Sequence, residues 1–250
     1  MKTSLTDIDS YRSVCHRFLR DENAFAQFRS YSNDYNRVLE HVSHAKGQEY
    51  LNLALVACPD IVNNLHKISI NDVVGKPIMY HYPGTTGQFS PTTLRYTKVM
   101  ADIYEMMGGY DTGDEIIEIG GGYGGQCRII DTFMKPKRYT IIDLPVVLKL
   151  QEKYLNYFYP RVKMRFIAPD RVRKLKGEGF DLVISNFSFD ELLLKYQKIY
   201  FNEILKKSRH GYISGRFDRD GHMGLEMFED WANIREYIPD TGFNCHTITW

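Results

Sequence analysis

The stretch Glu115–Gly125, EIIEIGGGYGG, decides the fold of this chain of 250 residues. It joins a short run rich in isoleucine to five glycines within six positions. Isoleucine is typical of buried strands, and successive glycines permit a sharp turn that a Cβ would obstruct. We therefore predict a strand, a tight turn, and then a helix whose first N–H groups point at a bound ligand.

The glycine run fits two ligand-binding patterns. Gly120, Gly122 and Gly125 satisfy G-x-G-x-x-G, which is typical of dinucleotide sites. Glu118 together with Gly120, Gly122 and Gly124 satisfies E-x-G-x-G-x-G, a signature of S-adenosylmethionine binding. The glycines alone fit many patterns and do not choose between the two.

The carboxylate of Glu118 distinguishes these patterns. At the end of the strand it would repel a pyrophosphate, whereas it would favour the ammonium and sulfonium groups of S-adenosylmethionine. A structural turn with a solvated Glu118 is the remaining alternative. We predict S-adenosylmethionine as cofactor, with contacts from Glu118, Gly120, Gly121 and Gly122.

Beyond this turn, short apolar runs alternate with longer amphipathic ones. The predicted strands cover residues 115–120, 139–144, 164–169, 181–187, 211–217 and 243–250. The predicted helices lie near residues 124–135, 146–158, 190–207 and 223–237. This alternation predicts an α/β fold with a doubly wound, mostly parallel sheet, which binds ligands at the carboxyl ends of its strands.

The N-terminal part has a different character. Residues 1–110 contain no convincing strand, and we expect a helical segment with a lid, followed by a cofactor-binding core over 111–250. Residues 76–87, KPIMYHYPGTTG, have the composition of a loop. Ser90 and Pro91 have the pattern of an N-cap and first helical position, and the helix after them should stop at Gly108-Gly109.

The second strand of the core ends at Asp143, followed by Leu144 and Pro145. An acid at this place accepts hydrogen bonds from the ribose hydroxyls of an adenosine ligand, so we predict that Asp143 and Leu144 contact the cofactor. A helix cap is the alternative role of Asp143, and the two roles are compatible.

The fourth strand is followed by Ser185–Leu192, SNFSFDEL. It carries neither the Asn/Asp-Pro-Pro-aromatic tetrad of N6-amine methyltransferases nor the Pro-Cys nucleophile of C5 enzymes. Nucleic acid is therefore a poor substrate hypothesis. We interpret the basic runs around residues 135–138, 171–176 and 206–209 as solvated helix ends and loops.

Composition agrees with this interpretation. The chain has 32 Lys and Arg against 31 Asp and Glu, and 43% of its residues are hydrophobic. The near-neutral charge gives no general attraction to nucleic acid or anionic membranes. No apolar run approaches the length of a membrane span, the first residues lack a signal-peptide core, and the cysteines lack metal-site spacing. We expect a cytoplasmic protein with structural thiols.

Four stretches together carry a resemblance to a known family. YHYPGTTGQFSPTTLRYTKV (80–99), EIIEIGGGYGGQC (115–127), IIDLP (141–145) and SNFSFDEL (185–192) resemble the sugar O-methyltransferases of surface-polysaccharide and viral glycan genes. The likeness runs from about residue 25 to Trp250. It implies the class I methyltransferase, Rossmann-like fold, S-adenosylmethionine as donor and a sugar hydroxyl as acceptor. Asp190 replaces the serine of the family pattern, while Glu191 matches its acid.

A sugar hydroxyl is a weak nucleophile at neutral pH, so a positioned base assists its methylation. Glu191 is the first candidate, and Asp190, His81 and His222 follow. A helix-start acid stabilised by the dipole is the alternative role of Glu191. We predict no metal ligand, because Asp218, Asp220 and His222 read more readily as a turn than as a magnesium site.

Three further residues are predicted to contact the cofactor. Tyr82 shares the predicted lid with His81 and Thr86. Arg95 lies one turn into the helix that starts at Pro91, where its guanidinium could pair with the cofactor's carboxylate. Asn186 follows the fourth strand. A surface position is the alternative for Arg95.

Two other functional classes stay open. An NAD(P)-dependent sugar oxidoreductase or epimerase would use the same glycine turn and should carry a Tyr-x-x-x-Lys pair; Tyr96 with Lys98, like Tyr196 with Lys198, has the wrong spacing for it. A non-catalytic nucleotide-binding module is disfavoured by the acidic strand ends. The sequence does not identify the sugar, the methylated hydroxyl or the oligomeric state.

Overall fold

A computed structural model describes residues 5–250. The expectation for the start of the chain falls partly on residues 1–4, outside the described residues. The chain divides into two compact units. The helical unit comprises Met1–Gly108, Gly122–Phe133 and Lys149–Pro160, and the sheet unit comprises Gly109–Gly121, Met134–Leu148 and Arg161–Trp250.

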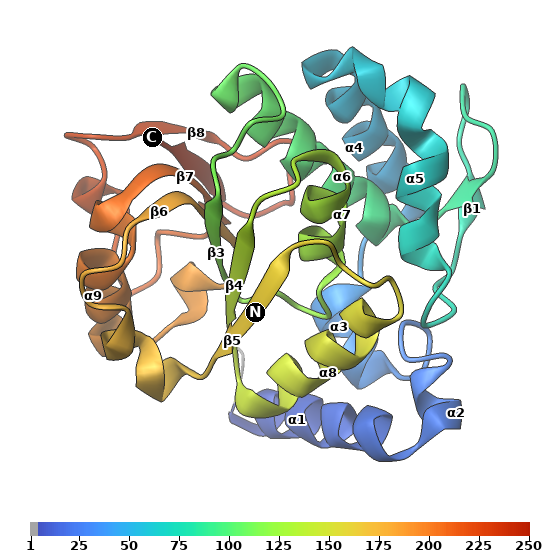
Figure 1. The fold of residues 1–250 in the computed structure, drawn as a ribbon, viewed down its shortest axis with the longest axis horizontal. Helices are drawn as coiled ribbons and strands as arrows, with labels where there is room; N and C mark the ends of the chain where they lie inside the picture. The colour runs from blue at the N-terminus through green and yellow to red at the C-terminus, as the bar shows by residue number, and fades with distance from the viewer. Residues whose placement is uncertain (1–4) are drawn as a thin grey trace. The chain divides into compact units, whose positions relative to one another are not determined.

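A seven-stranded sheet forms the frame of the sheet unit (Figure 1). Its strands are β3 (Glu115–Ile119), β4 (Arg138–Ile142), β5 (Lys163–Ile167), β6 (Phe180–Asn186), β7 (Ser208–Gly215), β8 (Asn233–Glu236) and β9 (His246–Thr249). They lie in the order β5-β4-β3-β6-β7-β9-β8. Strands β3 to β7 are parallel, and β9 is antiparallel to both β7 and β8. The mostly parallel sheet predicted from the sequence is confirmed.

One face of this sheet packs against helix α9 (Leu194–Glu203) and short 3-10 turns. Alternate residues of the central strands, such as Ile117, Val183 and Ile213, meet Tyr200 and Phe201 of α9 in one buried cluster. Pro169–Leu175 (η3), Phe189–Glu191 (η4), Leu205–Lys207 (η5) and Leu225–Met227 (η6) are the 3-10 turns. The period of two along each strand places these apolar side chains on the same face.

Two helix predictions in this unit need correction. The helix expected over 190–207 is divided into η4, α9 and η5. The helix expected over 223–237 is wrong: η6 and β8 occupy that range. In β8 only Ile234 is partly buried against the core, while its neighbours Asn233 and Arg235 are exposed. This alternation is that of a sheet-edge strand, and pairing with β9 overrides the helical pattern.

The helical unit contains most of the helices. They are α1 (Leu5–Arg20), α2 (Glu22–Phe25), α3 (Asn33–Leu39), α4 (His44–Ala57), η1 (Pro59–Asn64), α5 (Leu65–Ser69), η2 (Ile70–Asp72), α6 (Pro91–Met107) and α7 (Gly125–Phe133). The unit also holds α8 (Pro145–Asn156) from Lys149 onward. Two short antiparallel strands, β1 (Tyr80–His81) and β2 (Gln88–Phe89), form a hairpin. The expectation that this region has no strand was therefore wrong.

The ends of α6 are those the sequence predicts. The Ser90 hydroxyl accepts a hydrogen bond from the Thr93 N–H at 3.1 Å, and Pro91 occupies the first turn. Gly108 ends the helix in the left-handed conformation, with φ +69°. Local signals therefore mark both ends of this helix.

A buried ion network lies beside this N-cap. The fully buried Arg29 guanidinium donates to Asp72 Oδ1 at 2.7 Å and to Ser90 Oγ at 2.7 Å, and it also pairs with Glu40. Asp72 accepts from the Ser90 N–H and from the Thr93 hydroxyl. The network joins the connection between α2 and α3 to the end of η2 and the start of α6. Because Asp72 and Ser90 flank segment 73–89, its two ends are held together.

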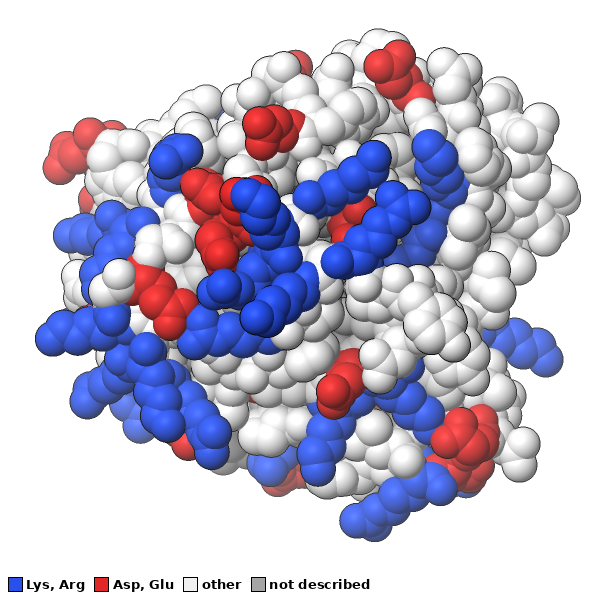
Figure 2. Space-filling model, viewed as in Figure 1, with Lys and Arg blue, Asp and Glu red and all other residues white. Residues whose placement is uncertain are grey.

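The domain boundary at residue 110 stays a prediction. Among the residues of the described range 5–250, no helix is long and apolar enough to cross a membrane. Figure 2 shows Lys and Arg side chains interleaved with Asp and Glu over β3, β4 and β5. Ion pairs such as Arg138 with Glu115 and Arg165 with Glu178 account for part of this pattern. The basic side chains there do not form a uniformly positive surface.

Candidate active site at the strand ends

The carboxyl ends of β3, β4, β6 and β7 lie at one edge of the sheet, because these strands are parallel neighbours. β3 leads into Gly120, β4 into Asp143 and β6 ends at Asn186. This is the edge at which open α/β sheets bind ligands. Most of the predicted site residues therefore meet within the sheet unit.

Gly120 opens the turn after β3. Its φ is +77°, and its N–H donates to the Ile142 carbonyl at 2.9 Å. A Cβ at this position would lie 2.0 Å from Ser188 Oγ. Gly121, which follows, is buried. The turn after β3 and the turn after β6 thus touch at a place where only glycine fits.

Gly122 continues the turn into the helical unit. Its φ is +57°, and its carbonyl accepts from Gln151 Nε2 at 3.0 Å. A Cβ on Gly122 would approach Leu39 Cδ2 to 3.1 Å. Positive φ at both Gly120 and Gly122 explains the need for glycine in the motif.

Glu118 lies below the turn. Its side chain is 2% exposed, and Oε2 accepts a hydrogen bond from the Tyr139 hydroxyl at 2.9 Å. Burial raises the pKa of Glu118 to about 8; the Tyr139 hydrogen bond opposes the rise, and the nearby Asp143 adds to it. At neutral pH without a nearby cation, this carboxyl is therefore largely protonated, a property that the sequence argument did not include.

Asp143 and Leu144 lie at the end of β4 and are half-buried. The Asp143 N–H donates to the Ile167 carbonyl of β5 at 3.3 Å, and its Oδ1 accepts from the Leu144 N–H at 2.8 Å. The first bond continues the β4–β5 ladder beyond the strand. Asp143 is thus held at the edge beside the strand that leads into Gly120.

Asn186 ends β6 between β3 and β7. Its side-chain amide nitrogen and oxygen are both buried and have no hydrogen-bond partner among the described residues. A buried amide without partners costs free energy, which a ligand can recover by supplying a donor and an acceptor. Asn186 is therefore suited to a polar ligand at this edge.

Asp190 lies in η4 and is 1% exposed. Its Oδ2 accepts from the Arg216 N–H at 3.0 Å, and a Cβ on Gly215 would lie 2.7 Å from its Cγ. Burial raises the pKa of Asp190, while the Arg216 N–H and the Arg219 charge oppose the rise. Asp190 thus fixes η4 to the segment that follows β7.

Glu191 differs from its neighbour in accessibility. Its side chain is 47% exposed, and its Oε1 lies 3.9 Å from an Arg219 nitrogen. Desolvation by the surrounding protein and the charge of Asp190 raise the pKa of Glu191 to about 7. The positive charge of Arg219 opposes this rise. A carboxylate with this pKa exchanges protons near neutrality, as a general base requires.

The sequence argument did not single out Arg216 and Arg219. Both lie in RFDRDGH, directly after β7, where the argument considered only possible magnesium ligands. Arg219 approaches both Asp190 and Glu191, at 3.8 and 3.9 Å. In the same segment, His222 Nδ1 is buried without a hydrogen-bond partner among the described residues. The sequence signal that could have identified Arg216 and Arg219 is a cationic residue directly after a strand that borders the site.

The other predicted residues belong to the helical unit. His81 is exposed, and its carbonyl lies 3.3 Å from His44 Nε2. Tyr82 is 3% exposed and packs on α4, where a Cβ on Gly47 would lie 2.3 Å from its hydroxyl. Burial raises the pKa of Tyr82. The Arg95 guanidinium lies 5.5 Å from the Tyr96 ring centre. The functional roles of these three residues stay predictions.

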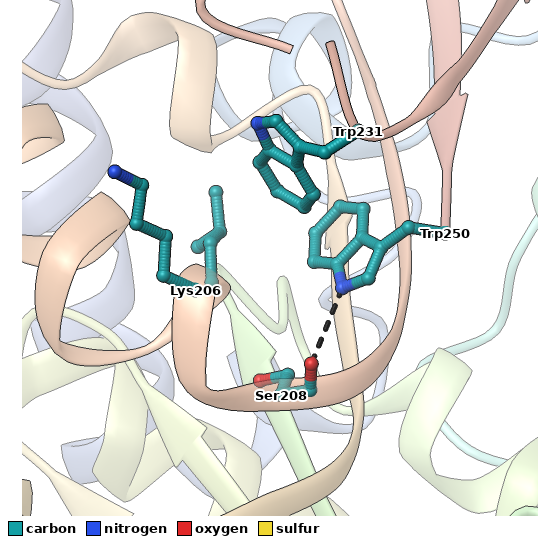
Figure 3. A pocket seen from close by; sticks show the side chains of 5 residues that line it. Lys206, Ser208, Trp231 and Trp250 are labelled. Atoms are coloured by element: carbon teal, nitrogen blue, oxygen red, sulfur yellow. Dashed lines mark hydrogen bonds between the residues drawn. The ribbon is translucent and has the colours of Figure 1, made fainter.

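A cavity of about 250 Å³ lies elsewhere in the sheet unit, lined by Leu205, Lys206, Ser208, Trp231 and Trp250 (Figure 3). Ser208 begins β7, and Trp250 follows the antiparallel β9. Both therefore lie at the amino edge of the parallel strands, opposite Asn186. The Trp250 indole N–H donates to the Ser208 carbonyl at 3.3 Å. This cavity is separate from the candidate site.

The residues at the carboxyl edge fit an S-adenosylmethionine molecule. The Gly120 turn brings backbone close to any ligand, the Asn186 amide lacks partners, and Asp143 offers an acceptor beside them. Glu118 would regain its charge next to an ammonium group, because a nearby cation favours the ionised form.

Comparison with known proteins gives no family. No family model matches the chain, and no curated protein matches it. Solved structures do match. A sarcosine dimethylglycine methyltransferase from Galdieria sulphuraria is 18% identical, with a TM-score of 0.43 over 56% of this chain and 53% of that one.

Two further matches have slightly higher TM-scores. N-methyltransferase NodS from Bradyrhizobium japonicum, in complex with S-adenosylhomocysteine, is 16% identical, with a TM-score of 0.48 over 62% of this chain and 84% of that one. An O-methyltransferase family protein from Burkholderia thailandensis is 13% identical, with a TM-score of 0.48 over 62% of this chain and 55% of that one. This chain spans about half the length of the Galdieria and Burkholderia proteins.

The strand order, with one antiparallel strand next to the last, identifies the architecture. The fold is a doubly wound, mostly parallel α/β sheet, as the sequence predicts. Identities of this size say nothing about the substrate, which has to be argued from the site.

Proposed function

We propose that this chain is an S-adenosylmethionine-dependent O-methyltransferase that acts on a hydroxyl of a sugar, in a glycan or a glycoside. The observation that carries the proposal is the position of Glu191. It lies three residues beyond Ser188, whose hydroxyl touches the Gly120 turn, and it is both accessible and close to neutral pKa. The sugar acceptor rests on the sequence resemblance.

The cofactor would be held by residues of the carboxyl edge. Asp143 would accept hydrogen bonds from the ribose hydroxyls, and the Leu144 side chain would lie against the adenine. Gly120, Gly121 and Gly122 leave room for the backbone to approach the ligand closely. Glu118 would face the ammonium group, and Asn186 would use its unpartnered amide. We assign Arg95 to the cofactor's carboxylate and Tyr82 to the lid formed by residues 76–87.

S-adenosylmethionine would supply a methyl group whose bond to the sulfonium sulfur breaks as the acceptor oxygen bonds to carbon, the electron pair remaining on sulfur. Glu191 takes the proton that the acceptor hydroxyl loses. Asp190 holds η4 through the Arg216 N–H, and so fixes the backbone that carries Glu191. Arg219 keeps part of the Glu191 population ionised at neutral pH. His81 is a further candidate for the base.

Calorimetry with S-adenosylhomocysteine and NAD in parallel tests the cofactor. We expect binding of S-adenosylhomocysteine and none of NAD. The NAD experiment is needed because protonated Glu118 would not repel a pyrophosphate. Binding of NAD alone would instead support an NAD(P)-dependent sugar oxidoreductase or epimerase. Radiolabelled methyl transfer to a panel of hexosides and deoxyhexosides then tests the acceptor, and no incorporation into any of them would contradict the sugar proposal.

A further inference from the structure

Phe187 has an unusual backbone conformation. It follows the last residue of β6 with φ +53°, in the left-handed region that bulky residues seldom adopt. Such strain persists only where the surrounding structure imposes it, and it is concentrated at functional sites. Glycine would adopt this conformation without strain. A phenylalanine at this strained position therefore suggests that its side chain has a role that glycine could not fill.

The turn that holds Phe187 is fixed from two sides. The Phe187 N–H donates to the Ser214 carbonyl of β7 at 2.7 Å. On the other side, the Ser185 hydroxyl donates to the Ile119 carbonyl of β3 at 3.1 Å and accepts from the Phe189 N–H at 3.0 Å. These bonds anchor the turn on β3 and β7. Along the chain, Phe187 lies between Asn186, assigned to the cofactor, and Glu191, the proposed base.

The Phe187 ring is supported from one side. It meets Tyr237 edge to face, with ring centres 5.0 Å apart and planes at 79°. Tyr237 is 4% exposed, so its ring is fixed in the core, whereas Phe187 is half-buried. Part of the Phe187 ring is therefore accessible at the carboxyl edge, beside Asn186, whose amide atoms lack partners.

We propose that Phe187 determines acceptor specificity by stacking against the apolar C–H face of a pyranose ring. This inference rests on the proposed function and names the acceptor class more narrowly. The face of an aromatic ring carries partial negative charge, which attracts the weakly positive C–H groups of a sugar face. The left-handed backbone sets the direction of the ring, and Tyr237 keeps it there.

Phe187→Gly separates strain from function. It relieves the backbone strain but loses the contact with Tyr237, so these effects oppose each other and its melting temperature should stay close to that of the wild type. Loss of the stacking surface should raise the KM for a pyranoside about tenfold. The turnover number and the affinity for S-adenosylhomocysteine should change less than about twofold, because neither Glu191 nor the glycine turn is altered. Phe187→Trp should keep KM near the wild-type value.

Tyr159 provides a matched control. It is also an aromatic residue at positive φ, +47°, but it is 87% exposed and lies in the loop after α8. Tyr159→Gly should relieve comparable strain and leave KM unchanged. The acceptor panel should include pyranosides and a catechol, which has a flat aromatic ring in place of a sugar face.

The outcomes separate this inference from the proposed function. A wild type that methylates pyranosides, with a raised KM in Phe187→Gly alone, supports the inference. If wild type and Phe187→Gly methylate pyranosides with the same KM, the stacking role is overturned and the proposed function stands. Methylation of the catechol without any pyranoside overturns the pyranose assignment, and absence of S-adenosylhomocysteine binding overturns both.

Discussion

Two buried polar sites, the Arg29 network of the helical unit and the strand ends of the sheet unit, differ in how their groups are satisfied. In the helical unit, the buried Arg29 and Asp72 pair with one another and share Ser90, and Asp72 also accepts from the Thr93 hydroxyl. In the sheet unit, the amide of Asn186 is buried without a partner among the described residues, and the carboxyl of Glu118 has a strongly raised pKa. An unsatisfied buried amide and a carboxyl with a raised pKa at the carboxyl ends of parallel strands favour a ligand site there.

Both cores contain aromatic clusters. Phe18, Phe28, Tyr35, Tyr123 and Tyr154 form edge-to-face pairs in the helical unit, with ring centres 4.9 to 6.1 Å apart. In the sheet unit, isoleucine and valine side chains of the parallel strands pack against an aromatic cluster around Phe228. Its polar residues are concentrated where those strands end. The comparison indicates that substitutions in the helical unit should affect stability first, and those at the strand ends should affect chemistry first.

Glu191→Gln should show the largest effect. The amide keeps the shape of the side chain but cannot accept a proton at neutral pH, so turnover should fall about 10²–10⁴-fold. Because the pKa of Glu191 is about 7, wild-type kcat/KM should rise with pH, reach half of its maximum near pH 7 and level off about one unit above it, while the variant should show no such rise. Initial rates of methyl transfer from pH 5.5 to 9 measure both.

Asp190→Asn is the control for this substitution. Asp190 is buried and bonded to the Arg216 N–H, so its change should affect turnover only mildly. If Asp190→Asn abolishes turnover and Glu191→Gln does not, the base is Asp190. If neither substitution reduces turnover, the carboxylate mechanism is wrong and His81 or His222 becomes the candidate.

Arg29→Met tests the helical unit. It leaves Asp72 and Glu40 buried without their cation, which should lower the free energy of unfolding by about 3–5 kcal/mol. Arg37→Met is the control in the same unit, because the pair of Arg37 with Asp34 is exposed and should contribute no more than about 1 kcal/mol. Urea denaturation measures both. Equal losses would show that burial of the network does not matter.

Gly120→Ala tests the contact between the two turns of the sheet unit. The new Cβ would displace Ser188, so affinity for S-adenosylhomocysteine should fall by about tenfold or more. Gly177 has a similar φ, +86°, with no atom within 4 Å of an added Cβ. Gly177→Ala thus introduces comparable strain without the contact, and calorimetry should find its affinity unchanged. A loss of affinity in both variants would attribute the effect to strain alone.

The smallest effect is expected for the pH dependence of cofactor binding. If an ammonium group restores the charge of Glu118, binding releases a proton, and affinity should rise up to about fivefold between pH 7 and pH 8. Glu118→Gln should remove this dependence. An identical pH dependence in the variant would exclude Glu118 as its source.

The same group affects stability. The unfolded chain ionises Glu118 above about pH 4.5, but the folded protein does so only near pH 8. The folded state therefore holds an additional proton in this window, and the free energy of unfolding falls as pH rises through it. Glu118→Gln should flatten that decline in urea denaturation.

Local sequence signals predicted much of the fold correctly. Ser90-Pro91 and Gly108 fixed the ends of α6, because a cap and a left-handed glycine act within a few residues. The strands β3, β4, β6 and β7 were predicted because each lies inside the sheet between two other strands. Such buried strands need runs of apolar residues, which are visible in the sequence. β8 was missed because its pairing with β9, not its own composition, makes it a strand.

The sequence by itself determined the glycine turn, the parallel sheet and the acids and amide at the strand ends, because these follow from backbone conformation and strand periodicity. Only the tertiary structure decided how each of these groups behaves. It distinguished the accessible Glu191 from the buried Asp190, raised the pKa of Glu118 through burial, and left the Asn186 amide without a partner among residues 5–250. Burial and charge depend on residues distant in the chain, which no local pattern contains.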